Sequence, residues 1–192
     1  GHSIHYLIKR DETKAAHPEY YAVYDGVRAT TFGGGDGAPC LSSTGLFDDC
    51  VAFAKEIFNN YKENAVSIWP PDGYYDVCEC QLCNGKGTYE RGEAGQISDY
   101  VFDFVDRVAQ ELYQTHPSKI VLTGSYGGFK LPPLDIDKMC TNVAVVIVRH
   151  PDIFMDAAFD QFNRDLAEDW LDKLPSKKVY FWDKYMHADA DG

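Results

Sequence analysis

The sequence predicts an α/β fold of the (β/α) TIM-barrel type, and two observations point to it. Segments rich in β-branched residues alternate with amphipathic segments long enough for helices, which is typical of parallel βαβ units. Polar and aromatic residues recur where the strand-like segments end, as on the loops of barrel enzymes. About five of a barrel's eight strands are recognisable, and a complete barrel usually needs about 250 residues. We therefore expect residues 1–192 to form a single, partial barrel domain.

Three segments have apolar residues spaced by three and four, which predicts helices. The first begins near Ser43 or Thr44, either of which can cap its N-terminus. The second covers about residues 98–113 and the third about residues 155–174. The side chains of the third helix that we expect to face the core are Phe159, Phe162, Leu166 and Trp170.

Strand-like segments lie between these helices. The run at 143–148 is almost entirely β-branched, as expected of a strand covered on both faces. Asp25-Gly26 between Tyr- and Val-rich flanks predicts a hairpin over residues 20–30. The other expected strands are 4–8, 65–69, 120–123 and 179–182.

A doubly wound, nucleotide-binding sheet is the alternative architecture. That fold carries a glycine-rich turn directly between a strand and a helix. Here Gly33-Gly34-Gly35 lies in a long loop, and the sequence has neither G-x-G-x-x-G nor a P-loop lysine. The barrel is therefore favoured, and we expect no organic cofactor.

Composition and charge exclude two classes of function. With 45% hydrophobic and 25% charged residues, the chain has the balance of a folded domain with a core. The 30 acidic and 18 basic residues give a net charge of −12, whose field repels phosphate backbones, so no nucleic-acid partner is expected. The longest apolar run is far shorter than the roughly 20 residues that span a bilayer, so no membrane span is expected.

Candidate site residues follow four of the predicted strands. The carboxyl ends of parallel barrel strands meet at one rim, so these side chains are expected to form one site. The candidates for catalysis are the carboxylates Asp72 and Asp183. The candidates for binding substrate are Trp69, Tyr126, His150, Trp182, Tyr185 and, at the start of the chain, His2.

Carboxylates among aromatic rings suit a saccharide. Sugar C–H faces stack on Trp and Tyr rings, while carboxylates bind hydroxyls or act as acid and base. Each residue also has a structural alternative, because an Asp between Pro and Gly is often a turn residue and a Trp that ends a strand is usually in the core. The recurrence at four strand ends favours the saccharide hypothesis for the set.

A cysteine-rich loop forms an insertion at residues 74–96. Cys78, Cys80 and Cys83 lie within six residues, a spacing that suits thiolate coordination of zinc, with Cys40 as the best candidate for a fourth ligand. Four sulfurs leave no open position for water, so such a zinc ion would be structural. Disulfides in a secreted protein and free thiols are the alternatives.

Several short motifs follow one another along the chain. They are His17-Pro18-Glu19-Tyr20-Tyr21-Ala22 with Asp25-Gly26-Val27-Arg28, Cys40-Leu41-Ser42, Pro71-Asp72-Gly73 before the C-x-C-x-x-C loop, and Trp182-Asp183-Lys184-Tyr185. Their order resembles that of the bacterial family called domain of unknown function 4838. Pro71 stands where that family usually has Asn, so substrate preference here can differ.

The resemblance implies a glycoside-hydrolase-like TIM barrel, similar in style to alpha-glucuronidases and often exported to the periplasm, the cell surface or the medium. The strand count, about five of eight, separately predicts that this chain is a fragment of a larger parent protein. The resemblance supplies no proven catalytic residues, and it does not distinguish a metal from disulfides at the cysteines.

Two functional hypotheses result. The first is a carbohydrate-active protein of glycoside hydrolase type, in which Asp72 and Asp183 act on a polysaccharide or oligosaccharide. The second is a non-catalytic, zinc-stapled module that binds carbohydrate or protein. The sequence leaves open the sugar, the linkage, retention or inversion, and the oligomeric state.

Overall fold

A computed structural model describes residues 3–31, 37–149 and 157–183. The N-terminal part contains two short helices, a 3-10 turn and a small antiparallel hairpin: α1 (Ser3–Ile8), α2 (Asp11–Ala16), η1 (Pro18–Tyr20), β1 (Val23–Tyr24) and β2 (Val27–Arg28). The hairpin turns at Asp25-Gly26, where both residues have positive φ, and this confirms the predicted turn.

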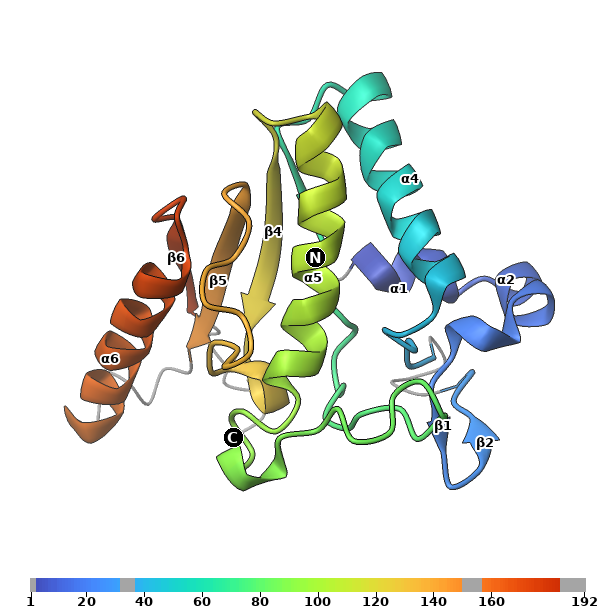
Figure 1. The fold of residues 1–192 in the computed structure, drawn as a ribbon, viewed down its shortest axis with the longest axis horizontal. Coiled ribbons are helices and arrows are strands. Elements are labelled where there is room, and N and C mark those ends of the chain that lie inside the picture. The colour runs from blue at the N-terminus through green and yellow to red at the C-terminus, as the bar shows by residue number, and fades with distance from the viewer. Residues whose placement is uncertain (1–2, 32–36, 150–156, 184–192) are drawn as a thin grey trace, which may run out of the picture.

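The rest of the described chain alternates strands with long helices (Figure 1). Its elements are α4 (Thr44–Asn60), β3 (Ala65–Ser67), η2 (Tyr89–Arg91), α5 (Ser98–Thr115), β4 (Ile120–Ser125), η3 (Gly127–Phe129), β5 (Val143–Arg149), α6 (Ala157–Lys173) and β6 (Val179–Asp183). The Ser43 side chain caps α4 by accepting a hydrogen bond from the Leu46 amide, as the sequence predicts.

Four strands form one parallel sheet in the order β3-β4-β5-β6, so neighbours in the sequence are neighbours in the sheet. This confirms the α/β class and the alternation of parallel strands with helices. The order never reverses, whereas a doubly wound sheet has a point where it does. The described residues form an open sheet and show no closed barrel.

The long helices pack on one face of this sheet. In α6, the Trp170 Nε1–H donates to the Ser125 hydroxyl of β4 over 3.1 Å, and its ring meets Phe102 of α5 edge-on at 4.7 Å between centroids. Trp170 and Phe102 are fully buried. Helix α4 in turn packs against α5 and β3 (Figure 1).

The opposite face of the sheet is apolar and partly open. Ser125 and its register partners Ile147 and Phe181 start from the face that carries the helices. Because side chains alternate along a strand, the residues on either side of each of these point to the opposite face. On the edge strand β6 these are Tyr180 and Trp182, each 50% exposed. Leu122, Val146 and Val148 are half-buried on the same face.

Two expectations about local structure are wrong. Residues 4–8 form part of helix α1 and not a strand, because Ile4 and Ile8, four residues apart, turn to the same side and are both buried. Phe159 and Phe162 of α6 are 38% and 39% exposed, because the helix turns Leu166 and Trp170 into the core.

Among the helices of the described residues, none is long and apolar enough to cross a membrane.

Candidate functional site

Three aromatic rings gather at the carboxyl end of the sheet. Trp69 follows β3, Tyr126 follows β4, and Trp182 is near the end of β6. The Trp69 indole is stacked with the Trp182 indole at 6.5 Å between centroids and 19° between planes, and it meets the Tyr126 ring edge-on at 6.1 Å. Trp69 is buried while Trp182 is half exposed, so the pair presents one indole to the surface. We call Trp69, Tyr126 and Trp182 the aromatic platform.

A glycine of β4 lets the platform form. A Cβ atom placed on Gly124 would lie 1.8 Å from Cε3 of Trp69, far inside van der Waals contact. The indole therefore lies directly on the strand backbone, and no larger residue fits at position 124 without displacing it.

Asp72 is the carboxylate beside this platform. It lies exposed in the turn after β3, beside the Tyr126 phenol, whose hydroxyl donates to the Pro71 carbonyl over 3.4 Å. Burial first, and then the Asp72 carboxylate, raise the pKa of Tyr126 above its usual range. The phenol therefore stays protonated, and its hydrogen bond to Pro71 holds it next to Asp72.

Asp183, the second candidate carboxylate, is held by an arginine. Both of its oxygens accept from the Arg149 guanidinium, at 2.7 Å from Nε and 3.0 Å from Nη2. The two residues are register partners at the ends of β5 and β6, and Phe181 lies under the guanidinium at 4.0 Å. Asp183 alternates with Trp182 along β6, so its side chain starts from the face of the sheet that carries the helices.

The structure thus brings Trp69, Asp72, Tyr126, Trp182 and Asp183 to one edge of the sheet. His2, His150 and Tyr185 lie outside the described residues. Sequence reasoning did not select Arg149 as a site residue. The sequence does show that one predicted strand ends in Arg149 and another in Asp183. Only the register of β5 and β6 shows that these two side chains pair.

The four candidate cysteines converge on one point. Cys40, Cys78, Cys80 and Cys83 place their sulfurs within 4.8 Å of one another. The Sγ–Sγ distances are 3.8 Å for Cys40–Cys80, 3.6 Å for Cys40–Cys83 and 3.5 Å for Cys80–Cys83. No disulfide joins them, and all four are free thiols. We call this group the cysteine cluster.

The spacing of the cysteine cluster fits a metal ion. Zinc–sulfur bonds of about 2.3 Å in a tetrahedron put the sulfurs about 3.8 Å apart, whereas a disulfide needs about 2.05 Å. The three Sγ–Sγ distances given above are close to the tetrahedral value. The cluster could therefore bind a metal such as zinc.

Hydrogen bonds around the sulfurs suit thiolates. The amides of Val23 and Cys80 donate to the Cys78 sulfur at 3.3 and 3.4 Å, and the Tyr100 hydroxyl lies 3.2 Å from the Cys83 sulfur. The Cys40 and Cys78 thiols, with lesser help from Ser42 and Tyr100, lower the pKa of Cys83 far below its usual range, whereas hydrogen bonds to Cys78 and Cys83 and burial raise the pKa of Cys40 well above its own. The cluster by itself thus favours one thiolate, at Cys83.

A family comparison can now be set beside this geometry. The model of the family described as "Domain of unknown function (DUF4838)" matches residues 1–188. The chain belongs to the DUF4838 family. No curated protein and no solved structure gives a significant match.

In this DUF4838 domain, the His-Pro-Glu-Tyr segment supports the cysteine cluster. His17 stacks on Tyr20 at 4.5 Å, and the Tyr20 hydroxyl donates to Asp49 of α4 over 2.8 Å. The Tyr20 carbonyl accepts from the Cys40 amide at 2.8 Å. The segment therefore docks the N-terminal part on α4 and places the first cysteine.

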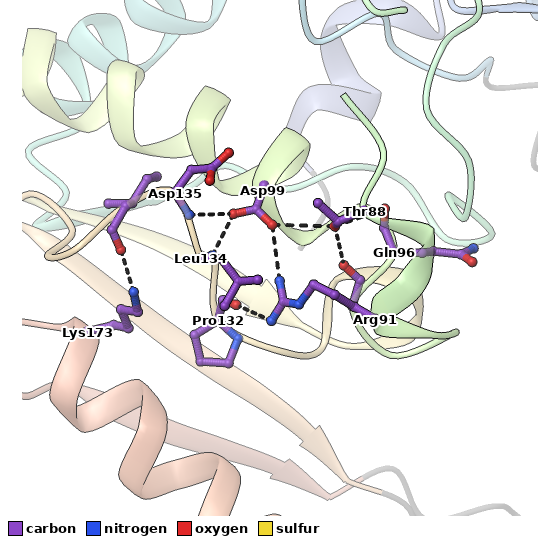
Figure 2. A network of polar contacts seen from close by, with 10 residues as sticks. Thr88, Arg91, Gln96, Asp99, Pro132, Leu134, Asp135 and Lys173 are labelled. Atoms are coloured by element: carbon purple, nitrogen blue, oxygen red, sulfur yellow. Dashed lines mark hydrogen bonds and ion pairs between the residues drawn. The ribbon is translucent and has the colours of Figure 1, made fainter. Parts of the chain in front are cut away.

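A second polar network fixes the loop that follows the cysteines (Figure 2). Asp99, at the start of α5, accepts from the Leu134 and Asp135 amides at 2.6 and 2.9 Å and from Arg91 at 3.2 Å. Arg91 also donates to the Pro132 carbonyl over 2.7 Å. Asp99 is buried and fully engaged, so we assign it a structural role in joining residues 88–97 to the loop after β4.

Proposed function

We propose that this DUF4838 domain is the saccharide-recognising part of a carbohydrate-active, glycoside-hydrolase-like protein. The observation that carries the proposal is the aromatic platform, with Trp182 half exposed over the buried Trp69 and Asp72 beside Tyr126. An indole face binds the C–H face of a sugar, and a neighbouring carboxylate binds or protonates its oxygens.

Asp72 is the carboxylate that we propose for acid–base chemistry. It is exposed and lies beside the Tyr126 phenol. Asp183 as a catalytic residue stays a prediction, because its oxygens are both engaged by Arg149 and that ion pair would have to open. The Arg149–Asp183 pair is better suited to fixing the end of β6 and the position of Trp182.

We propose that the sheet is one side of a (β/α) barrel completed by further strands of a parent protein. The support is its consecutive order, the long helices on one face, and the apolar face with half-exposed Tyr180. Parallel sheets are almost always covered on both faces, and in a barrel the helix-free face is the packed interior.

A structural zinc ion in the cysteine cluster is the second part of the proposal, supported by the tetrahedral spacing of the sulfurs. With four thiolates around it, the ion would have no open position, so we assign it no catalytic step. A zinc-stapled module that binds saccharide without cleaving it is the alternative function.

The barrel proposal predicts further βα units in the parent gene. Sequence on either side of the 192 residues should encode strands that alternate with helices, and the longer chain should cover Tyr180 while Trp182, near the carboxyl end of β6, stays accessible. Hydroxyl-radical footprinting of Tyr180 in both lengths measures this. Equal oxidation of Tyr180 in the longer chain would contradict the proposal.

Replacing Trp182 with Ala should weaken saccharide binding. Stacking of a sugar on an aromatic ring contributes about 0.5–1.5 kcal/mol of binding free energy, so its loss should raise the Kd roughly 2–10-fold. The matched control is Phe181→Ala, which removes an equally exposed ring from the other face of the same strand. Calorimetry against a panel of oligosaccharides measures both, and an equal loss in the two variants would refute the platform.

Replacing Asp72 with Asn should lower kcat for hydrolysis by about 100-fold or more, because the amide cannot transfer a proton. The control is Asp76→Asn, another exposed carboxylate of the same loop, which should keep activity. Circular dichroism should show an intact fold in both. Full activity of the Asp72 variant would contradict the catalytic role of Asp72. If the unmodified protein binds saccharide but does not cleave it, the non-catalytic binding module is the correct function.

Zinc should co-purify at one ion per chain, as measured by elemental analysis. Cys80→Ser should abolish stoichiometric binding, whereas Cys140→Ser, outside the cluster, should not. Metal removal should cost at least about 2 kcal/mol of stability, which lowers Tm by roughly 4–8 °C. Protein that carries no metal after expression in zinc-supplemented medium would rule the site out.

A further inference from the structure

A pocket of about 580 Å³ adjoins the aromatic platform at the same edge of the sheet. Its lining comes from the loop after β3, the loop before α5 and the turn after β4, namely Tyr75, Glu93, Ala94, Gln96, Gly127 and Lys130. Gly127 directly follows Tyr126 of the platform, and Tyr75 comes three residues after Asp72. The pocket therefore lies at the same end of the sheet as the platform.

The backbone of Lys130 is fixed by the core. Its amide donates to the Ala94 carbonyl over 2.8 Å. Its carbonyl accepts from the Ser125 hydroxyl at 2.6 Å and from Trp170 Nε1 at 3.3 Å. The network around Asp99 holds the segment that contains Ala94 (Figure 2). The Lys130 side chain thus leaves a rigid point, and its position in the pocket is built into the fold.

Among the described residues, the Lys130 ammonium has aromatic neighbours but no carboxylate partner. Its Nζ lies 5.6 and 5.1 Å from the ring centres of Phe159 and Phe162, the two α6 residues that remain unexpectedly exposed. Within the described residues it makes no ion pair, not even with Glu93 of the same pocket. Burial lowers the pKa of Lys130, as expected of a cation without a counter-charge.

Other lysines of this acidic protein show the contrast. Lys55 pairs with Glu111 at 3.4 Å and Lys138 with Asp172 at 3.4 Å. With 30 acidic residues on the chain, carboxylate partners are plentiful, yet none of those in residues 3–31, 37–149 and 157–183 pairs with Lys130. A half-buried cation that lines a pocket gains most from an anion supplied by a ligand.

We propose that this pocket receives an anionic group, a carboxylate or a sulfate, of the saccharide bound on the aromatic platform, and that Lys130 is its counter-charge. The inference rests on the proposed function and names the ligand class: an acidic sugar. Phe159 and Phe162 form an apolar wall beside the charge. Glu93 and Gln96 offer an acceptor and an amide for the sugar hydroxyls.

The test uses matched acidic and neutral probes. The first pair is an oligogalacturonate and its methyl ester, and the second is a sulfated galactan oligomer and its desulfated form. Calorimetry should give at least about tenfold tighter binding of one acidic member than of its neutral partner, as expected for a charge-assisted hydrogen bond. A preference within the first pair identifies the anionic group as a carboxylate, and a preference within the second identifies it as a sulfate.

Lys130→Met should remove that preference and leave the affinity for the neutral probe within about twofold. The control is Lys138→Met, which removes an exposed lysine away from the pocket and should keep the preference. A preference that survives in Lys130→Met, or an unmodified protein that binds acidic and neutral probes equally, would overturn the inference while leaving the platform intact.

If no saccharide binds, the proposed function is contradicted. Anion binding at Lys130 is then tested separately. With ¹³C-dimethylated lysines, the resonance assigned through Lys130→Met should shift on titration with sulfate or galacturonate monomer. A shift larger than that of Lys138 supports an anion site, and no such difference overturns it.

Discussion

The convergence of four thiols is the constraint on which the positions of the other site residues depend. Between β3 and α5 the chain forms no strand and only one short 3-10 turn, so this long segment has few backbone ladders to hold it. The cysteine cluster joins it to the segment before α4 and, through the Val23 amide, to the β1–β2 hairpin. A bound metal would convert these weak thiol contacts into a rigid cross-link between segments far apart in sequence.

The same segment carries the candidate saccharide site at its other end. Between Asp72 and Cys78, the fully buried Tyr74 donates its hydroxyl to the Pro39 carbonyl over 2.9 Å, next to Cys40. Tyr24 of the hairpin donates to the Asp76 carbonyl over 2.9 Å. The short segment 72–78 therefore connects the aromatic platform to the cysteine cluster and is held in place along its length. A change at the cysteines should reach Asp72 through this connection and leave the sheet in place.

Local patterns were sufficient to predict much of the fold and part of the site. Helical spacing located α4 and α5, the β-branched run located β5, and short cysteine spacing with Cys40 gave the whole cluster. The predictions failed or were incomplete where contacts between distant segments determine the structure. Residues 4–8 are too few to separate strand from helix, and the orientation of α6 depends on Trp170 reaching Ser125. The pairing of Arg149 with Asp183 requires the β5–β6 register, and the isolation of Lys130 requires the shape of the pocket.

The two carboxylates at the sheet edge are not equivalent, and this difference bears on chemistry. Asp183 gives both oxygens to Arg149, so that ion pair has to open before a ligand can use this carboxylate. Asp72 stays exposed beside the Tyr126 phenol, so a ligand can reach it. Acid–base sites generally place their carboxylates in contrasting environments.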